Sequence, residues 1–128
     1  MSPRIIFLVV AAGCLLMMQA QDLSRKWSKI GEQNLLIGLE SENEGLRTSA
    51  AQFLGDIKSE KSVIPIIHML NSEKDETNRI LAAISLYKIG DLREIRAIKD
   101  AITRDESELV QRTCQILVSS YYYITPVN

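Results

Sequence analysis

The residues that could perform chemistry in this 128-residue sequence are few and far apart. His68 is the single histidine, so the chain cannot build a histidine-based metal cluster. No Gly-x-Ser-x-Gly elbow accompanies His68 for a serine triad, and no glycine-rich phosphate-binding loop occurs. We therefore expect no catalytic residue, no metal and no cofactor, and a protein that is not an enzyme.

Carboxylates gather in three short polar segments that precede apolar stretches. Each segment contributes three acidic residues: Glu40, Glu42 and Glu44, then Glu73, Asp75 and Glu76, then Asp105, Glu106 and Glu108. Carboxylates at a helix start complement the positive end of the helix dipole, which favours a role in capping and solubility. Weak calcium binding, or the binding of a basic partner along one edge, is the alternative hypothesis.

The first twenty residues indicate export. Arg4 precedes a continuous apolar run from Ile5 to Met18, and the small Ala20 precedes a polar boundary. This order is typical of a secretory signal peptide, here residues 1–20. The apolar run is shorter than the roughly 18 residues that begin to suggest a membrane-spanning helix. We expect a periplasmic or secreted protein.

The two cysteines bear on the same question. The sequence Ala-Ala-Gly-Cys ending at Cys14 resembles a bacterial lipobox, so a membrane-anchored lipoprotein is the alternative, although the run after Cys14 stays apolar. Cleavage after Ala20 would leave Cys114 as the single cysteine, which excludes an intramolecular disulfide. We expect Cys114 to be a buried small apolar residue.

The charge of the chain limits its partners. Without Arg4 the chain carries 14 basic and 16 acidic side chains. A near balance of charge argues against nucleic-acid binding and, after signal cleavage, against binding to an anionic membrane.

A period of 32 residues organises the rest of the chain. The matching positions carry Arg47, Arg79 and Gln111, then Ala50, Ala82 and Cys114, then Leu54, Leu86 and Val118. Such a period indicates stacked helical units. We predict an all-α fold, a short right-handed α-solenoid of about three helical hairpins. Its domain would cover residues 21–121, with repeats at about 22–57, 60–90 and 91–121 and a tail at 122–128.

Helix signals support these boundaries. Asn43 and Asp75 are predicted N-caps, and Gly90 is predicted to end a helix in the left-handed conformation. Asp91 and Glu94 have the spacing of a capping box. The helix expected at 44–57 has a predicted inward face of Leu46, Ala50, Phe53, Leu54 and Ile57, and the helix after Asp75 is apolar nearly all round, which predicts burial on several sides.

Residues 62–91 resemble a HEAT repeat, with Pro65 in the first helix and an Arg-x-x-Ala start at Arg79 in the second. The short period resembles bacterial HEAT-like repeats of the phycobilin lyase type. Residues 46–57 match as a second helix, and residues 92–121 match loosely because Gln111 replaces the arginine. The resemblance implies that Arg47 and Arg79 tie neighbouring repeats together.

The resemblance implies a non-enzymatic scaffold that binds another protein through its second helices. The candidate contact residues are the outward positions of these helices: Thr48, Gln52, Asp56, Ile80, Ile84, Tyr87, Lys88, Gln111 and Gln115. Ile84 and Tyr87 would be either anchors of the contact or part of the core. Tyr122 and Tyr123 are candidates for a homodimer contact at the C-terminal end. An enzyme accessory or lyase-like protein that holds a small ligand is the alternative.

Overall fold

The computed structural model describes residues 2–125, except for the side chains at positions 4, 6–9 and 27. The chain divides into two compact units, residues 1–33 and residues 34–128. Within the described residues every regular element is helical, which confirms the all-α prediction. The helices are α1 (Pro3–Gly38), α2 (Glu44–Asp56), α3 (Val63–Ser72), α4 (Glu76–Ile89), α5 (Leu92–Arg104) and α6 (Glu108–Ile124), with a 3-10 turn at Glu60–Ser62.

The first unit consists of the larger part of α1. The apolar run of the N-terminus and the amphipathic segment that follows Asp22 form one continuous helix. In the part of the chain that the structure describes, no helix combines the length and hydropathy needed to cross a membrane.

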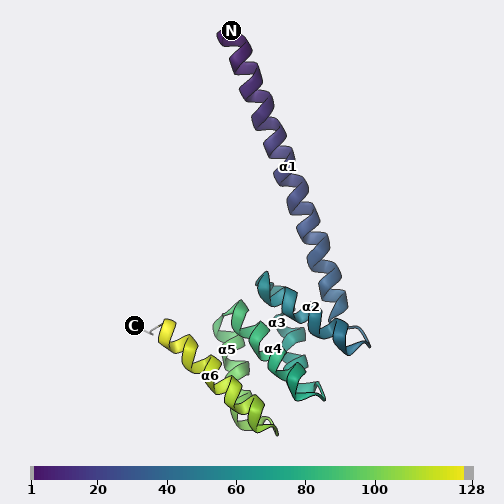
Figure 1. Ribbon diagram of the computed structural model, residues 1–128, viewed down its shortest axis with the longest axis vertical. Helices are drawn as coiled ribbons and strands as arrows, with labels where there is room; N and C mark the ends of the chain where they lie inside the picture. Colours follow the sequence, from purple (N-terminus) through teal and green to yellow (C-terminus); the bar gives the residue numbers. More distant parts are fainter. Residues whose placement is uncertain (1, 126–128) are drawn as a thin grey trace. The chain divides into compact units, whose positions relative to one another are not determined.

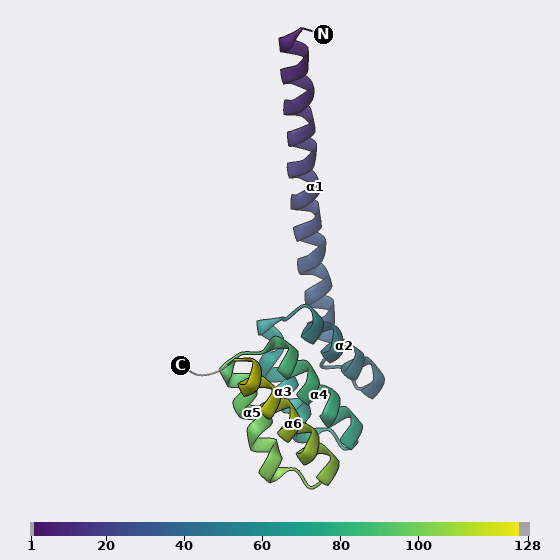
Figure 2. The ribbon, with the colours of Figure 1, turned by 60° about the vertical axis from the view of Figure 1, so that its left-hand side comes forward.

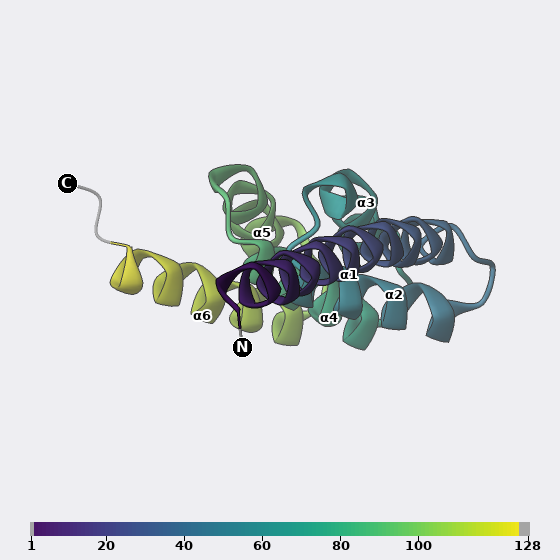
Figure 3. The same ribbon diagram turned by 90° about the horizontal axis from the view of Figure 1, so that it is seen from above.

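The second unit is a stack of helices in two layers (Figures 1 and 2). Figure 3 shows α2, α4 and α6 side by side in one layer, with α3 and α5 in the other. The pairs α3/α4 and α5/α6 pack as helical hairpins, and α4 also packs against α2, α5 and α6. The arrangement confirms a short solenoid and the burial of α4 on several sides. We call α2, α4 and α6 the B helices, and α3 and α5 the A helices.

The helix ends follow the predicted caps. The Asn43 side chain accepts a hydrogen bond from the backbone N–H of Leu46 at 3.0 Å, and Asp75 accepts one from Thr77 at 2.6 Å. Gly90 ends α4 with φ of 76°, the left-handed region in which a residue without Cβ is favoured. These local signals set where the B helices begin and how α4 turns into α5.

The predicted capping box of α5 forms only in part. Asp91 accepts a hydrogen bond from the N–H of Leu92 at 2.7 Å, but Glu94 does not reach back to complete the box. Glu94 is fully buried, and within the described structure neither of its carboxylate oxygens has a hydrogen-bond partner. The nearest cationic atom is Arg93 Nε, 3.6 Å away. Ser62, the position equivalent to Glu94 in the preceding repeat, is buried as well. The packing of the repeats therefore buries this position in both of them.

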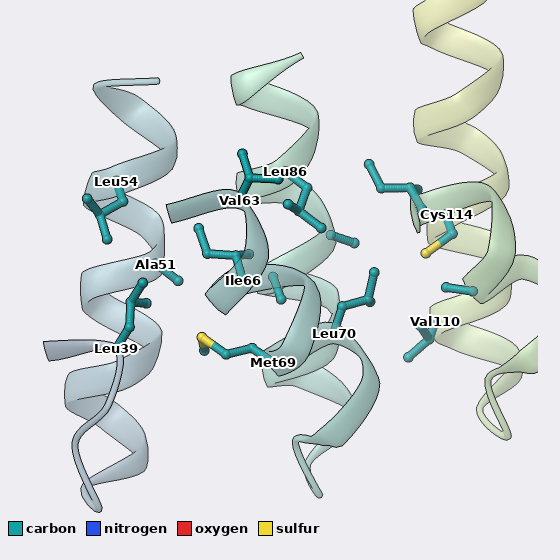
Figure 4. Packing of buried hydrophobic residues seen from close by; sticks show 14 of the residues in the cluster. Leu39, Ala51, Leu54, Val63, Ile66, Met69, Leu70, Leu86, Val110 and Cys114 are labelled. Atoms are coloured by element: carbon teal, nitrogen blue, oxygen red, sulfur yellow. The ribbon is translucent and has the colours of Figure 1, made fainter. Parts of the chain in front are cut away.

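The hydrophobic core lies between the two layers (Figure 4). Its fully buried larger residues come from every helix of the stack: Leu54, Val63, Ile66, Leu70, Leu86, Ile95, Ile98, Val110 and Cys114. A fully buried aliphatic side chain contributes about 1.5–3 kcal/mol, so this core accounts for most of the driving force for folding. The burial of Cys114 confirms its expected role, and desolvation raises the pKa of its thiol to about 11.

The predicted inward face of α2 is wrong at three of its five positions. Ala50 and Leu54 are in the core, but Leu46, Phe53 and Ile57 are 52%, 58% and 54% exposed. The reason is that α2 packs chiefly against α4 within this unit, and the three exposed residues lie on another side of the helix.

Candidate protein-interaction surface

Arg47 joins the first B helix to the turn of the next repeat. Its Nε and Nη2 donate to the two carboxylate oxygens of Glu73 at 2.7 and 2.9 Å. Its Nη1 donates to the backbone carbonyls of Ser41 and Glu42 at 2.8 and 3.1 Å. The hydrogen bonds to Glu73 raise the pKa of Arg47, so its charge is fixed.

Arg79 repeats this arrangement one repeat later. It donates to both carboxylate oxygens of Asp105 at 2.8 and 2.9 Å, and to the carbonyls of Glu73 and Lys74 at 3.0 Å each. Gln111, at the third matching position, keeps the bond within its own repeat, to the Asp105 carbonyl at 2.6 Å. Arg47 and Arg79 are therefore structural residues, as the resemblance to HEAT repeats implied.

The acidic segments are largely engaged in the same stacking. Glu44 accepts a hydrogen bond from Asn78, and Glu76 accepts one from Ser107 of the next repeat. Among the residues that the structure describes, no group of three or more His, Cys, Asp or Glu side chains is placed to hold a metal ion. His68 is exposed, and its Nδ1 lies 3.2 Å from Ser72 Oγ.

An open groove of about 820 Å³ lies along α3 near the first two acidic segments. Ile64 and Met69 are among the apolar residues that line it, and Glu40 and His68 are among the polar ones. Although this volume falls in the range of small-ligand sites, its most buried charged groups, Arg47 and Glu73, are already paired with each other. We therefore do not assign a ligand to this groove.

The second candidate surface is the side of each B helix that lies opposite its buried residues, which we call the B-helix face. With 100° per residue and a period of 32, the face consists of equivalent positions in three helices: Ser49, Gln52 and Asp56 in α2, Leu81, Ile84 and Lys88 in α4, and Thr113, Ile116 and Ser120 in α6. Leu109 lies on the same face one turn before Thr113, at the position equivalent to Thr77. These three helices lie side by side in one layer (Figure 3).

Three of the predicted contact residues lie on this face and are exposed. They are Gln52, Asp56 and Lys88. Lys88 Nζ forms an ion pair with Asp56 Oδ1 at 2.5 Å across the two repeats, and both side chains are about half exposed. An exposed pair of this kind contributes only about 0–1 kcal/mol to stability, so both charges can be redirected to a partner at little cost.

The structure separates Ile84 from Tyr87. Tyr87 is half-buried and packs against the hydrophobic core, so it belongs to the stack rather than to the open face. Ile80 does the same, and Thr48 is buried, which corrects their assignment to an outward surface. Ile84 is half-buried but lies outside the core cluster, on the B-helix face.

Sequence reasoning missed the apolar residues of α6 on this face. Leu109 and Ile116 are 54% and 66% exposed, and Ile116 is the repeat equivalent of Ile84. Applying the period of 32 residues to Ile84 would have identified Ile116. Leu81 adds a half-buried apolar side chain beside Ile84. The face is therefore polar on α2 and apolar on α4 and α6.

A shallow groove lies on the same side between the first halves of α2 and α4. Its volume is about 540 Å³, and Ser49, Gln52, Thr77 and Leu81 are among its lining residues. The B-helix face thus contains a groove and both polar and apolar residues, as protein-binding surfaces usually do.

The predicted tyrosine contact lies at the end of α6, which continues through Ile124, three residues into the segment expected to be a tail. Tyr122 and Tyr123 are 43% and 89% exposed. The rings of Tyr121 and Tyr122 pack edge to face with centroids 5.5 Å apart, and Tyr121 is half-buried against the core. Tyr123 is therefore the most exposed tyrosine described at this end of α6.

Comparison with known proteins agrees with this geometry. A model of the family described as HEAT repeats matches residues 32–118, which is more than half of the chain. The match covers α2 through most of α6, the same segment that forms the two-layered stack. No curated protein matches the chain. The chain belongs to the HEAT repeats family.

Proposed function

We propose that this protein is a non-enzymatic scaffold that binds another protein through the B-helix face. The observation that carries the proposal is the exposure of Leu109 and Ile116 next to the Leu81 and Ile84 positions of α4. Ile84 and Ile116 occupy equivalent positions of neighbouring repeats, and Leu81 and Leu109 extend the apolar area along the same side of α4 and α6. Solenoids commonly bind partners along such extended surfaces.

The charged end of the face supports the same proposal. Asp56 and Lys88 lie on α2 and α4 beside the apolar strip, where they would form part of a polar rim. A partner with an apolar helix or strand flanked by charges of both signs fits this arrangement. HEAT repeats are commonly interaction scaffolds, which favours binding over catalysis for this chain.

The proposal is tested by the double substitution Ile84→Ser with Ile116→Ser. The matched control is Ile64→Ser, which removes an equally apolar side chain, 63% exposed, from the A layer. Cross-linking and affinity capture from the native envelope fraction would first identify the partner. Affinity would then be measured by calorimetry for the wild type and both variants.

We expect the double variant to lose at least tenfold in affinity while its melting temperature stays within a few degrees of the wild type, since neither residue belongs to the core. The control should bind as the wild type does. Unchanged binding by the double variant, or loss of binding by Ile64→Ser alone, would show that the partner uses another surface.

We also propose that the scaffold acts outside the cytoplasm. The basic start, short apolar run and small residue at Ala20 support cleavage after residue 20. Mass spectrometry of the protein from its native source tests this: the mature chain should begin at Gln21. A chain that begins with a lipidated Cys14 would instead establish the lipoprotein alternative, and an intact N-terminus would exclude both.

A further inference from the structure

Each B helix has two flanks that face the neighbouring repeats. We call the flank toward the preceding repeat the rear flank and the flank toward the following repeat the forward flank. At the α2/α4 contact, Thr48 Oγ1 donates to Asn78 Oδ1 at 3.2 Å. A Cβ placed on Gly55 would lie 2.9 Å from the Cα of Ser85. Asn78 and Ser85 thus mark the rear flank of α4, in close contact with α2.

The period of 32 residues identifies the rear flank of α2. Its residues are Leu46, Phe53 and Ile57, the equivalents of positions 78, 85 and 89. In α6 the same positions hold Val110, which is buried, and Leu117, which packs against the core. On α2 all three apolar side chains are more than half exposed. The rear flank of α2 therefore has the composition of a helix-packing surface but is more than half exposed.

The opposite end of the stack has the reverse character. The forward flank of α6 carries Arg112, Gln115 and Ser119, all exposed, where α4 has Ile80, Ala83 and Tyr87. The Arg112 side chain is paired with Glu108 at 2.5 Å within α6, and both are more than 70% exposed. This flank is polar, and its arginine is already paired.

The two ends therefore do not fit each other. A second copy stacked head to tail would press Arg112 and Gln115 against Phe53 and remove their polar groups from water without partners, which is costly. Two rear flanks of α2 brought together by a twofold axis match apolar residues with apolar residues. A twofold contact is also closed, so it does not extend into a filament.

We propose that the rear flank of α2 is the interface of a twofold-symmetric homodimer, in which Leu46, Phe53 and Ile57 pack against the same residues of a second copy. The 13 residues of α2 span about 20 Å. A single helix pair of this length buries less than the roughly 800 Å² per partner of a standard interface. The dimer should therefore be weak and reversible. The B-helix face stays free for another protein, so this inference stands apart from the proposed function.

Sedimentation equilibrium of the purified protein from about 1 to 500 μM tests the proposal. The variants are Phe53→Ser, Leu46→Glu and Tyr123→Ser. Leu46→Glu would bring a charge into the apolar contact, and Tyr123→Ser removes an aromatic side chain that is 89% exposed at the C-terminal end. Circular dichroism confirms that each variant is folded, which is expected because all three residues are exposed.

The wild type and Tyr123→Ser should approach twice the monomer mass as concentration rises. Phe53→Ser and Leu46→Glu should raise the dissociation constant at least tenfold. A wild type that stays monomeric across the whole range would overturn the proposal. So would a dimer that Tyr123→Ser dissociates and that Phe53→Ser and Leu46→Glu leave intact, because that pattern assigns the contact to the C-terminal end.

Discussion

At the scale of single residues, the two arginine–carboxylate pairs differ in burial. In the Arg79–Asp105 pair both side chains are about one-twelfth exposed or less, whereas Arg47 is 23% exposed beside Glu73. Removing one partner of a buried pair leaves the other charge without compensation, which costs about 3–5 kcal/mol. The cost should be smaller at Arg47, where water can replace part of the lost contact.

Because Asp105 is titratable, the Arg79–Asp105 pair should make the stability of the protein depend on pH. Burial raises the pKa of Asp105, but hydrogen bonds from Arg79 and the Ser107 N–H, together with the charge of Arg79, lower it below its ordinary value of 3.8. Because the folded pKa is the lower one, the stabilisation is present above the unfolded pKa and is lost as pH falls through the folded pKa. Urea unfolding should therefore show declining stability below about pH 4.

Arg79→Met provides the test of that assignment. We expect it to lower the free energy of unfolding at pH 7 by about 3 kcal/mol and to flatten the decline in acid, since Asp105 loses the partner that holds its pKa down. Arg47→Met is the control: it should cost less and keep the acid decline due to Asp105. An equally steep acid decline in the wild type and in Arg79→Met would show that another carboxylate is responsible.

What the sequence could predict at this scale depended on repetition. Arg47 and Arg79 recur at the repeat period, the resemblance to HEAT repeats implied that they tie neighbouring repeats together, and the structure confirms this role. Glu94 was judged from a local spacing that suits a capping box, yet its side chain lies in the core. Local spacing describes what a side chain could bond on its own helix. It does not describe which way the stack turns that helix.

At the scale of elements, the predicted caps and the glycine that ends α4 gave the correct ends of the B helices, because these signals act within one turn of the chain. The apolar pattern of α2 was less informative. It showed that Leu46 and Phe53 could face a neighbouring helix, but the presence of such a neighbour depends on the rest of the stack. The same limit applied to Ile84 and Tyr87, one helical turn apart, of which the structure places only Tyr87 against the core.

The contact between α2 and α4 depends on a small residue at Gly55. A methyl group there would lie 2.9 Å from the Cα of Ser85, a backbone atom that cannot move aside alone. Gly55→Ala should therefore push the two helices apart and destabilise the protein by about 1–3 kcal/mol, despite a gain of up to about 1 kcal/mol in helix propensity.

Gly45→Ala is the matched control in the same helix. Its new methyl group would meet Asn43 Oδ1 at 3.4 Å, an ordinary contact, so the variant should be neutral or stabilised by up to about 1 kcal/mol. Thermal and urea unfolding measure both variants. Equal stability of the two would mean that the α2/α4 contact adjusts without cost, contrary to the close packing seen at Ser85.

At the scale of the whole molecule, the period of 32 residues was enough to predict a solenoid, because every repeat must bury its apolar side against a neighbour. The period did not predict the proposed binding surface. The proposed surface consists of positions that no neighbouring helix covers. Ile84 and Ile116 could be assigned to it only once the packing of Tyr87 and Leu117 against the core was known.

The stack also predicts a gradient of local stability within residues 34–128. Helix α4 packs against α2, α3, α5 and α6, whereas α2 packs chiefly against α4, and the last turn of α6 exposes Tyr123 and Ile124. Amide hydrogen exchange at low protein concentration should therefore be slowest in α4, which opens only with global unfolding, faster in α2, and fastest at the end of α6.

The dependence of this exchange on protein concentration tests whether two copies meet through α2. If two copies meet through the rear flank of α2, protection of α2 should rise with protein concentration while protection of α4 stays constant, since α4 is already limited by global unfolding. The variant Phe53→Ser should abolish the rise in α2. Protection of α2 equal to that of α4 at the lowest concentration would contradict the gradient, because it would require α2 to be held by more than its contact with α4.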